Sequence, residues 1–205
     1  MNKDVELEYR VEIPFEEFEK QKSFLSKKAR IINQAKRISL MVFVFKNDTK
    51  SILYVRATKN VENDELDCEI VHKKGAQHSH DRKETTIKVS KDDFKKFFRL
   101  FSNFSADKKI VMQRETVNFV TENDINIALV KARKHAYIEV EKMCTEQEKE
   151  SVEKEVLNFV QDCGYKVLDE KGANELFERL DEIDDIKLTE EGEESQEIID
   201  ALEFL

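Results

Sequence analysis

Two pairs of glutamates recur at a spacing that gathers carboxylates on one surface. Glu6-x-Glu8 lies near the start of the chain with Arg10 two residues further on, and Glu139-x-Glu141 follows much later. On a β-strand, alternate residues share a face and lie about 7 Å apart, so each pair can meet one cation from a single wall. Four carboxylates on two strands repel one another unless a cation lies between them. A charged face in water is the alternative interpretation of a lone E-x-E.

Both pairs lie in segments that alternate with period two, which predicts β-strands. In residues 5–13 the glutamates and the arginine occupy one face. The opposite face is apolar and consists of Val5, Leu7, Tyr9, Val11 and Ile13. Residues 136–141 repeat this alternation around the second glutamate pair. We therefore expect two strands, each with one apolar face and one carboxylate face.

The order of these residues resembles a known family. Glu6-x-Glu8-x-Arg10 is similar to the E-x-E-x-K signature that opens the CYTH domains, which include class IV adenylyl cyclases and thiamine triphosphatases. Glu139-x-Glu141 is similar to the E-x-E that closes their barrel. The resemblance implies an α+β fold in which an eight-stranded antiparallel β-barrel, with helices packed outside, forms a tunnel. It also implies that the tunnel binds a triphosphate together with Mg²⁺ or Mn²⁺.

The resemblance also suggests which basic residues bind the phosphates. Arg10 stands where the signature has lysine. Arg56 matches one base of the family's R-x-R strand, with Tyr54 replacing the other, and Arg114 matches the arginine of K-x-R, with Met112 in place of lysine. The implied catalytic residues are Arg10, Arg56 and Arg114. The implied substrate-binding residues are Arg10, Arg56, Lys73, Lys74, Arg114, Lys131 and Arg133.

The implied metal ligands include one further carboxylate. Arg82-Lys83-Glu84 is similar to the R-R-E that contributes an acidic residue in the family. Where the family usually has an aspartate on its seventh strand, this chain has Leu129-Val130-Lys131 and no acid. The full implied set of metal ligands is Glu6, Glu8, Glu84, Glu139 and Glu141.

The remaining pattern predicts the other elements of the fold. Residues 27–37 hold a basic group that is either a solvated turn or part of a tunnel mouth. A phenylalanine stripe after Ser90 predicts a helix that buries its aromatic face. Further strands are expected at 38–45, 51–58, 65–74, 84–89, 109–121 and 125–133, and helices at 15–28, 146–163 and 174–183. These ranges suggest a tunnel domain over 1–144, C-terminal helices over 145–184 that pack on the barrel, and a flexible acidic tail over 185–205.

Composition limits the remaining possibilities. Charged residues make up 39% of the 205-residue chain and the net charge is −9, which excludes a general nucleic-acid footprint. The longest apolar run, residues 38–45, is too short to span a bilayer. The three cysteines form no C-x-x-C pair, and no phosphate-loop, dinucleotide or H-E-x-x-H motif occurs. We expect a cytoplasmic monomer or homodimer that acts on a small triphosphate and binds neither nucleic acid nor membrane.

Three functions remain open at this stage. The first is metal-dependent hydrolysis of a triphosphate, most simply inorganic triphosphate because it needs no base or sugar pocket; thiamine triphosphate or a nucleoside triphosphate are the neighbouring substrates. The second is cyclisation of ATP to cyclic AMP, which requires an adenine pocket. The third is a binding module for polyphosphate or nucleotide without catalysis, as the substitutions at Tyr54, Met112 and Val130 suggest.

Overall fold

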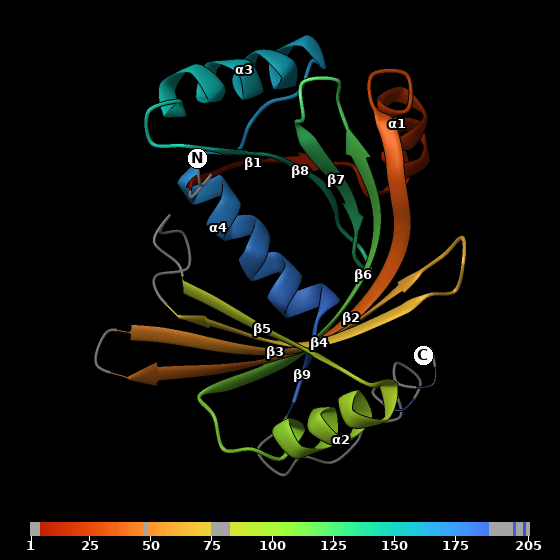
Figure 1. Ribbon diagram of the computed structural model, residues 1–205, viewed down its shortest axis with the longest axis vertical. Coiled ribbons are helices and arrows are strands. Elements are labelled where there is room, and N and C mark those ends of the chain that lie inside the picture. The colour runs from red at the N-terminus through yellow and green to blue at the C-terminus, as the bar shows by residue number, and fades with distance from the viewer. Residues whose placement is uncertain (1–4, 47–48, 75–82, 189–198, 200–202, 204–205) are drawn as a thin grey trace. The chain divides into compact units, whose positions relative to one another are not determined.

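A computed structural model describes residues 5–46, 49–74, 83–188, 199 and 203, without the side chains at 46, 49, 50, 74, 83 and 84. Its strands are β1 (Val5–Ile13), β2 (Arg30–Lys46), β3 (Thr49–Asn60), β4 (Leu66–Lys74), β5 (Lys83–Val89), β6 (Lys108–Val120), β7 (Asn126–Lys131), β8 (Ala136–Cys144) and β9 (Ile186–Lys187). Its helices are α1 (Phe18–Leu25), α2 (Lys91–Ser102), α3 (Lys149–Asp162) and α4 (Glu170–Arg179). A 3-10 turn (Phe15–Glu17) precedes α1 and a π-helical turn (Leu180–Asp184) follows α4 (Figure 1).

The strands follow the order β1-β8-β7-β6-β2-β3-β4-β5, and β9 pairs with β6. The chain divides into two compact units that interleave along the sequence. Unit 1 comprises residues 1–34 and 115–180, and unit 2 comprises residues 35–114 and 181–205. This division differs from the linear boundaries expected from the sequence, because the long strands β2 and β6 each contribute to both units. Whether residues 1–144 fold as a domain by themselves stays a prediction.

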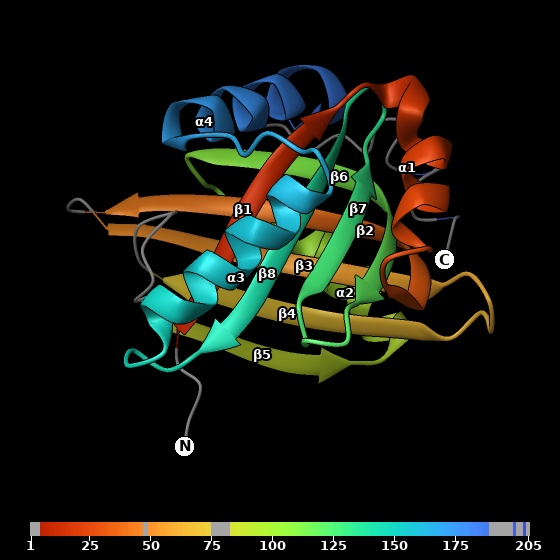
Figure 2. The same ribbon diagram turned by 90° about the horizontal axis from the view of Figure 1, so that it is seen from above.

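Unit 1 is built on the apolar face of β1. Val5, Leu7, Val11 and Ile13 are buried, as the period-two alternation predicted. Helix α3 covers this face and buries Val152, Val156 and Val160 in the same cluster (Figure 2). The helix begins at Lys149, later than the expected 146, after a turn in which the backbone N–H of Thr145 donates to a Glu148 carboxylate oxygen at 3.0 Å.

Helix α4 packs against the opposite face of unit 1, which corrects the expectation that every helix lies outside the carboxylate face. Its Leu176, together with Leu180 after it, is buried against Val130 of β7 and Tyr137 of β8. Tyr137 pairs with Glu12, so it belongs to the same face as the glutamates. The physical reason is that this face is polar only along part of its length and ends in an apolar patch that a helix must cover.

Unit 2 has a core of its own. Helix α2 buries Phe94 and Phe98 against Ile38 and Leu40 of β2 and Val55 of β3, which confirms the phenylalanine stripe as a core face. Ser90 caps this helix, because its hydroxyl accepts a hydrogen bond from the Asp93 backbone N–H at 3.1 Å. The other face of these strands carries Arg37, Arg56 and Thr58 at one end and an apolar cluster around Met41 and Phe43 at the other.

The α+β class, the antiparallel pairing of the strands and all eight expected strands are confirmed. The strand order, however, has two ends, so the hydrogen-bonded strands of the described residues form an open series and not the closed ring we expected. At the β1 end, the carbonyl of Arg10 accepts a hydrogen bond from the Leu168 backbone N–H at 2.8 Å. The segment before α4 therefore bonds to a backbone carbonyl of β1 with which a further strand would have to pair.

Two boundaries were wrong for identifiable reasons. Strand β2 begins at Arg30, so much of the basic group at residues 27–37 lies in a strand and not in a solvated turn. Residues 185–188 are not part of a tail, because Ile186 and Lys187 pair with β6 as β9. Both segments are rich in charge, which hid the alternation of their strands, although β2 lies inside the strand order, between β6 and β3.

Candidate functional site

The four carboxylates of the two E-x-E pairs share one face of unit 1. In the β1–β8 register, Glu8 lies directly opposite Glu141, and Arg10 lies directly opposite Glu139. Residues directly opposite in an antiparallel pair point to the same side, so the expected convergence of the two strands is confirmed within this unit. Glu6 follows on the same face, one pair further along β1.

Arg10 lies between two of these glutamates. Its Nε donates to Glu139 Oε1 at 3.1 Å, and its Nη2 contacts the Glu8 carboxylate. The guanidinium also lies over the ring of Phe177 in α4, with its central carbon 4.8 Å from the ring centroid. The planar guanidinium can bridge two carboxylates and stack on an aromatic ring at once, which the family's lysine cannot do.

The pKa values of this group show that the carboxylates are crowded. Burial raises the pKa of Glu8 to about 8, with nearby Glu139 adding to the shift and Arg10 opposing it. Burial also raises the pKa of Glu141 to about 7, with Glu6 as the next cause. Near neutral pH, Glu8 is therefore largely protonated and shares a hydrogen bond with Glu139. A cation binding here would take the place of these protons.

The carboxylates gather in two pairs, Glu8 with Glu139 and Glu6 with Glu141, each close enough for a side-chain hydrogen bond. Within the described residues, no three carboxylate, histidine or cysteine side chains form a ready-made metal cage. Mg²⁺ commonly binds through one or two carboxylates and completes its shell with water and substrate phosphates. The donor set therefore fits a hard divalent ion of this kind.

Unit 2 carries a polar face of different character. The β2–β3–β4 register places Arg56 opposite Glu69, and Lys73 lies on the same face of β4. Arg56 Nε is 2.7 Å from Glu69 Oε1, and Lys88 of β5 contacts the other oxygen of Glu69 at 3.2 Å. The Lys73 ammonium lies 5.7 Å from the ring centroid of Tyr54. This face therefore holds Arg56 and Lys73, two of the expected phosphate-binding residues.

Arg114 is already engaged by an acid of its own chain. Its Nη1 donates to Asp185 Oδ1 at 2.7 Å and its Nη2 donates to Asp185 Oδ2 at 3.1 Å. Both side chains are buried. Burial raises the pKa of Asp185, although the Arg114 hydrogen bond opposes the shift. The fork that was expected to hold phosphate is thus occupied by a carboxylate from the segment before β9.

The other expected residues lie elsewhere. Lys131 pairs with Ala136 and its ammonium lies 5.0 Å from the Phe15 ring centroid, on the apolar side of unit 1 and not with the glutamates. Arg133 is exposed in the turn after β7. The Glu84 backbone pairs with Lys73, but the side chains of Lys74 and Glu84 lie outside the described residues.

Sequence reasoning missed two residues that the structure brings into these faces. Asp185 was placed in an acidic tail, and only its position before the alternating Ile186-Lys187-Leu188 could have indicated a strand. Arg37 was placed in a basic turn, yet it lies in β2 on the polar face, where its Nε donates to Thr58 Oγ1 at 3.2 Å. The sequence did carry a signal for this position. Residues from Arg37 onward alternate with the apolar Ile38, Leu40 and Val42, so the strand expected from residue 38 could have been extended toward the N-terminus.

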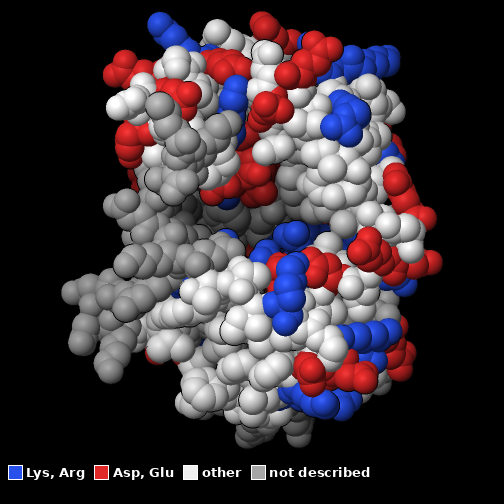
Figure 3. Space-filling view, viewed as in Figure 1, with Lys and Arg blue, Asp and Glu red and all other residues white. Residues whose placement is uncertain are grey.

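The surface is strongly charged, in keeping with the composition. On the side drawn in Figure 3, acidic and basic side chains both occur in quantity and are interspersed. No helix in the described ranges is both long enough and apolar enough to cross a membrane.

Comparisons with known proteins give the fold. No family model matches the chain, and no curated protein matches it by sequence. Among solved structures, the PH1819 protein of Pyrococcus horikoshii superposes with a TM-score of 0.59 at 18% identity, covering 85% of this chain and 98% of that one. A protein of Vibrio parahaemolyticus named as a candidate adenylate cyclase gives a TM-score of 0.55 at 10% identity, covering 96% and 98%.

A third structure is HpAC1 from Hippeastrum, an adenylyl cyclase candidate described as having a dominant triphosphatase activity. It gives a TM-score of 0.53 at 13% identity, covering 80% of this chain and 89% of that one. Identities this low establish a shared fold and nothing about activity. The chain therefore shares the fold of these three structures, which is consistent with the resemblance that the order of its two E-x-E pairs suggested.

Proposed function

We propose that this chain is a divalent-metal-dependent enzyme that hydrolyses a triphosphate, with inorganic triphosphate as the simplest substrate. The observation that supports it best is the pairing of Glu8 with Glu139 and of Glu6 with Glu141, with Arg10 between two of them. Carboxylates this close raise one another's pKa, and their repulsion lowers the stability of the fold when no cation is bound. Such an arrangement is typical of a functional site and not of a purely structural one. The shared fold with HpAC1 is consistent with this proposal.

In this proposal the glutamates of unit 1 hold Mg²⁺ or Mn²⁺. The chemistry that such an ion supplies at a carboxylate site is neutralisation of phosphate oxygens and a lowered pKa for a bound water. Glu8 and Glu141 would hold such a cation in their deprotonated form. Arg10, held in place by Glu8, Glu139 and the Phe177 ring, presents a fixed positive charge to the phosphate chain.

The polar face of unit 2, taken by itself, offers basic side chains of the kind that bind phosphate oxygens. Arg56 is the strongest candidate because its partly buried guanidinium is oriented by Glu69. Lys73 contributes a point charge beside Tyr54. Arginine forms two parallel hydrogen bonds to phosphate, whereas lysine acts as a single charge. Arg114 is a weaker candidate than the sequence suggested, because a phosphate would have to displace Asp185.

The test is a panel of product assays on the purified protein. Inorganic triphosphate, thiamine triphosphate and ATP are each incubated with Mg²⁺, with Mn²⁺ and with chelator, and released phosphate and cyclic AMP are both measured. Glu141→Gln is the test variant. Glu12→Gln is its matched control. Glu12 lies on the carboxylate face of β1, but its two carboxylate oxygens each accept a hydrogen bond from Arg179 Nη2 at 2.7 Å.

The expected result is metal-dependent phosphate release from at least one triphosphate. Glu141→Gln should abolish this release and Glu12→Gln should preserve it. Cyclic AMP from ATP without phosphate release would favour the cyclase that was left open above. Tight triphosphate binding with neither product would favour a binding module. Phosphate release that persists unchanged in Glu141→Gln would contradict the proposed role of the carboxylates.

A further inference from the structure

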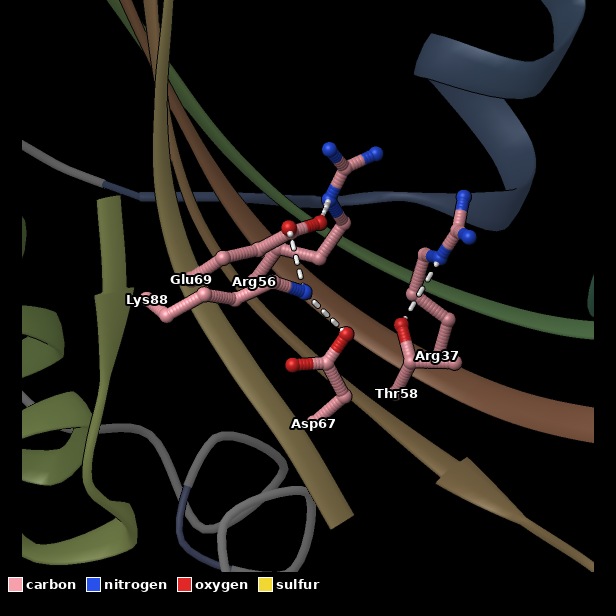
Figure 4. Close-up of polar contacts among 6 residues, drawn as sticks. All are labelled: Arg37, Arg56, Thr58, Asp67, Glu69 and Lys88. Atoms are coloured by element: carbon pink, nitrogen blue, oxygen red, sulfur yellow. Dashed lines mark hydrogen bonds and ion pairs between the residues drawn. The ribbon is translucent and has the colours of Figure 1, made fainter. Parts of the chain in front are cut away.

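Two arginines lie next to each other on the polar face of unit 2. Arg37 of β2 pairs with Thr58, and Arg56 of β3 pairs with Ser39. This register makes the two arginines diagonal neighbours on adjacent strands, a relationship that places residues about 7–8 Å apart. Figure 4 shows both guanidinium groups extending from the sheet toward the same side.

Each arginine is oriented by a neighbour on the next strand. Arg37 donates from Nε to the hydroxyl of Thr58 at 3.2 Å, a contact that helps to fix the direction of its side chain. Arg56 Nε lies 2.7 Å from Glu69 Oε1. That contact is a charge contact with poor hydrogen-bond alignment, so this buried N–H has no hydrogen-bond partner. Each arginine thus contacts a neighbour through Nε, and its terminal nitrogens are aimed away from the strands (Figure 4).

The negative charge beside Arg56 is shared with a second cation. Glu69 divides its one negative charge between Arg56 and Lys88, and Lys88 also contacts Asp67 (Figure 4). The Lys88 and Asp67 side chains are 62% and 54% exposed, so water screens that pair, whereas Arg56 and Glu69 are 17% and 15% exposed. Neighbouring cations that are partly withdrawn from water attract an anion with several acceptor oxygens.

We propose that Arg37 and Arg56 together bind one phosphate group of the substrate. This inference rests on the proposed function and adds Arg37, which no sequence motif indicated, to the substrate-binding residues. Two planar forks oriented to one side match the several oxygens of a phosphate better than one fork does. Arg37 would then supply, from β2, the second guanidinium that β3 lacks because Tyr54 stands at the first position of its R-x-R.

The test measures binding of inorganic triphosphate and of ATP by titration calorimetry with chelator present. Arg37→Gln removes the charge and the fork, and Arg37→Lys keeps the charge alone. Lys36→Gln is the matched control, because Lys36 is the adjacent residue, carries the same charge, is exposed and lies on the opposite face of β2. Thermal midpoints of all variants establish that each is folded.

Hydrogen bonds to a charged group predict that Arg37→Gln weakens both ligands by roughly tenfold to a hundredfold. Arg37→Lys should recover part of this loss, and Lys36→Gln should change affinity by less than about twofold. Equal affinities in Arg37→Gln and wild type would overturn the inference, as would an equal loss in Lys36→Gln or a loss for only one ligand. A wild-type protein that binds no triphosphate would instead refute the proposed function, and this inference with it.

Discussion

Arg114 and Asp185 form a buried, two-pronged ion pair, with Nη1 2.7 Å from Oδ1 and Nη2 3.1 Å from Oδ2. The Asp185 side chain is fully buried and that of Arg114 is 8% exposed. The pair joins β6 to the segment that leads into β9. A residue that the family resemblance assigned to phosphate binding is therefore part of the structural core of unit 2.

We predict that Arg114→Ala acts mainly on stability. Removing one partner of a buried ion pair leaves the other charge without compensation and costs about 3–5 kcal/mol in the free energy of unfolding. Asp185→Ala should destabilise the protein to a similar extent. The double variant Arg114→Met/Asp185→Leu should recover much of the loss, because it leaves no buried charge. Urea denaturation of the four proteins measures this, and a loss below about 1 kcal/mol in Arg114→Ala would show that the pair is not buried in solution.

Replacing Met112 by the lysine that the family has at this position should not improve phosphate binding. Met112 packs on an apolar cluster formed by Met41, Phe43, Ile52 and Ile110. An ammonium at this position would be partly withdrawn from water without a partner. We expect Met112→Lys to lower the midpoint of thermal unfolding, whereas Met112→Leu should leave it nearly unchanged. A lysine variant with wild-type stability and tighter triphosphate binding would instead restore the family's role for this position.

The metal-free protein should lose stability as the pH rises through neutrality. The pKa of Glu8 is raised from 4.5 to about 8 in the folded state, so the folded protein holds a proton that the unfolded chain releases. Stability must then fall between about pH 4.5 and 8, because over this range the unfolded state binds fewer protons. Glu141, with a pKa of about 7, adds a change of the same sign.

Urea denaturation at pH 5.5 and pH 8.5 with chelator measures this dependence. Glu8→Gln has no proton to lose at this position, so its stability should vary less with pH than that of the wild type. Glu12→Gln serves as the control and should vary as the wild type does. Identical pH dependence in wild type and Glu8→Gln would show that Glu8 titrates normally.

The sequence predicted the elements that depend on local periodicity. The alternation in residues 5–13 gave both the buried face of β1 and its carboxylate face, because on a strand a period of two separates them wherever the strand lies. The phenylalanines after Ser90 likewise predicted both a helix and its buried side. Placing both E-x-E pairs on the same face required the family resemblance. The period-two alternation of each segment does not say which strands are neighbours in the sheet.

What the sequence could not give depends on register and on contacts far apart in the chain. Arg37 and Arg56 are neighbours because of the β2–β3 register. The register of a hairpin depends on the length of its loop, which the sequence did not determine. The partner of Arg114 lies 71 residues away in a segment whose acidity suggested a solvated tail. The packing of α4 on the carboxylate face depends on an apolar patch that Val130 and Tyr137 form together. They lie on different strands, and neither strand by itself indicates such a patch.

The central claim, that crowded glutamates of unit 1 hold a divalent cation, is tested most directly by metal binding without substrate. Mg²⁺ and Mn²⁺ are titrated into metal-free wild type, Glu8→Gln, Glu141→Gln and Glu12→Gln at pH 7.5, in two buffers of different ionisation enthalpy. We predict that wild type and Glu12→Gln bind with equal affinity and release protons, because Glu8 is largely protonated before the cation arrives. Glu8→Gln and Glu141→Gln should bind roughly tenfold or more weakly, and Glu8→Gln should release fewer protons. Equal affinity in all four proteins, or no binding by the wild type, would contradict the claim.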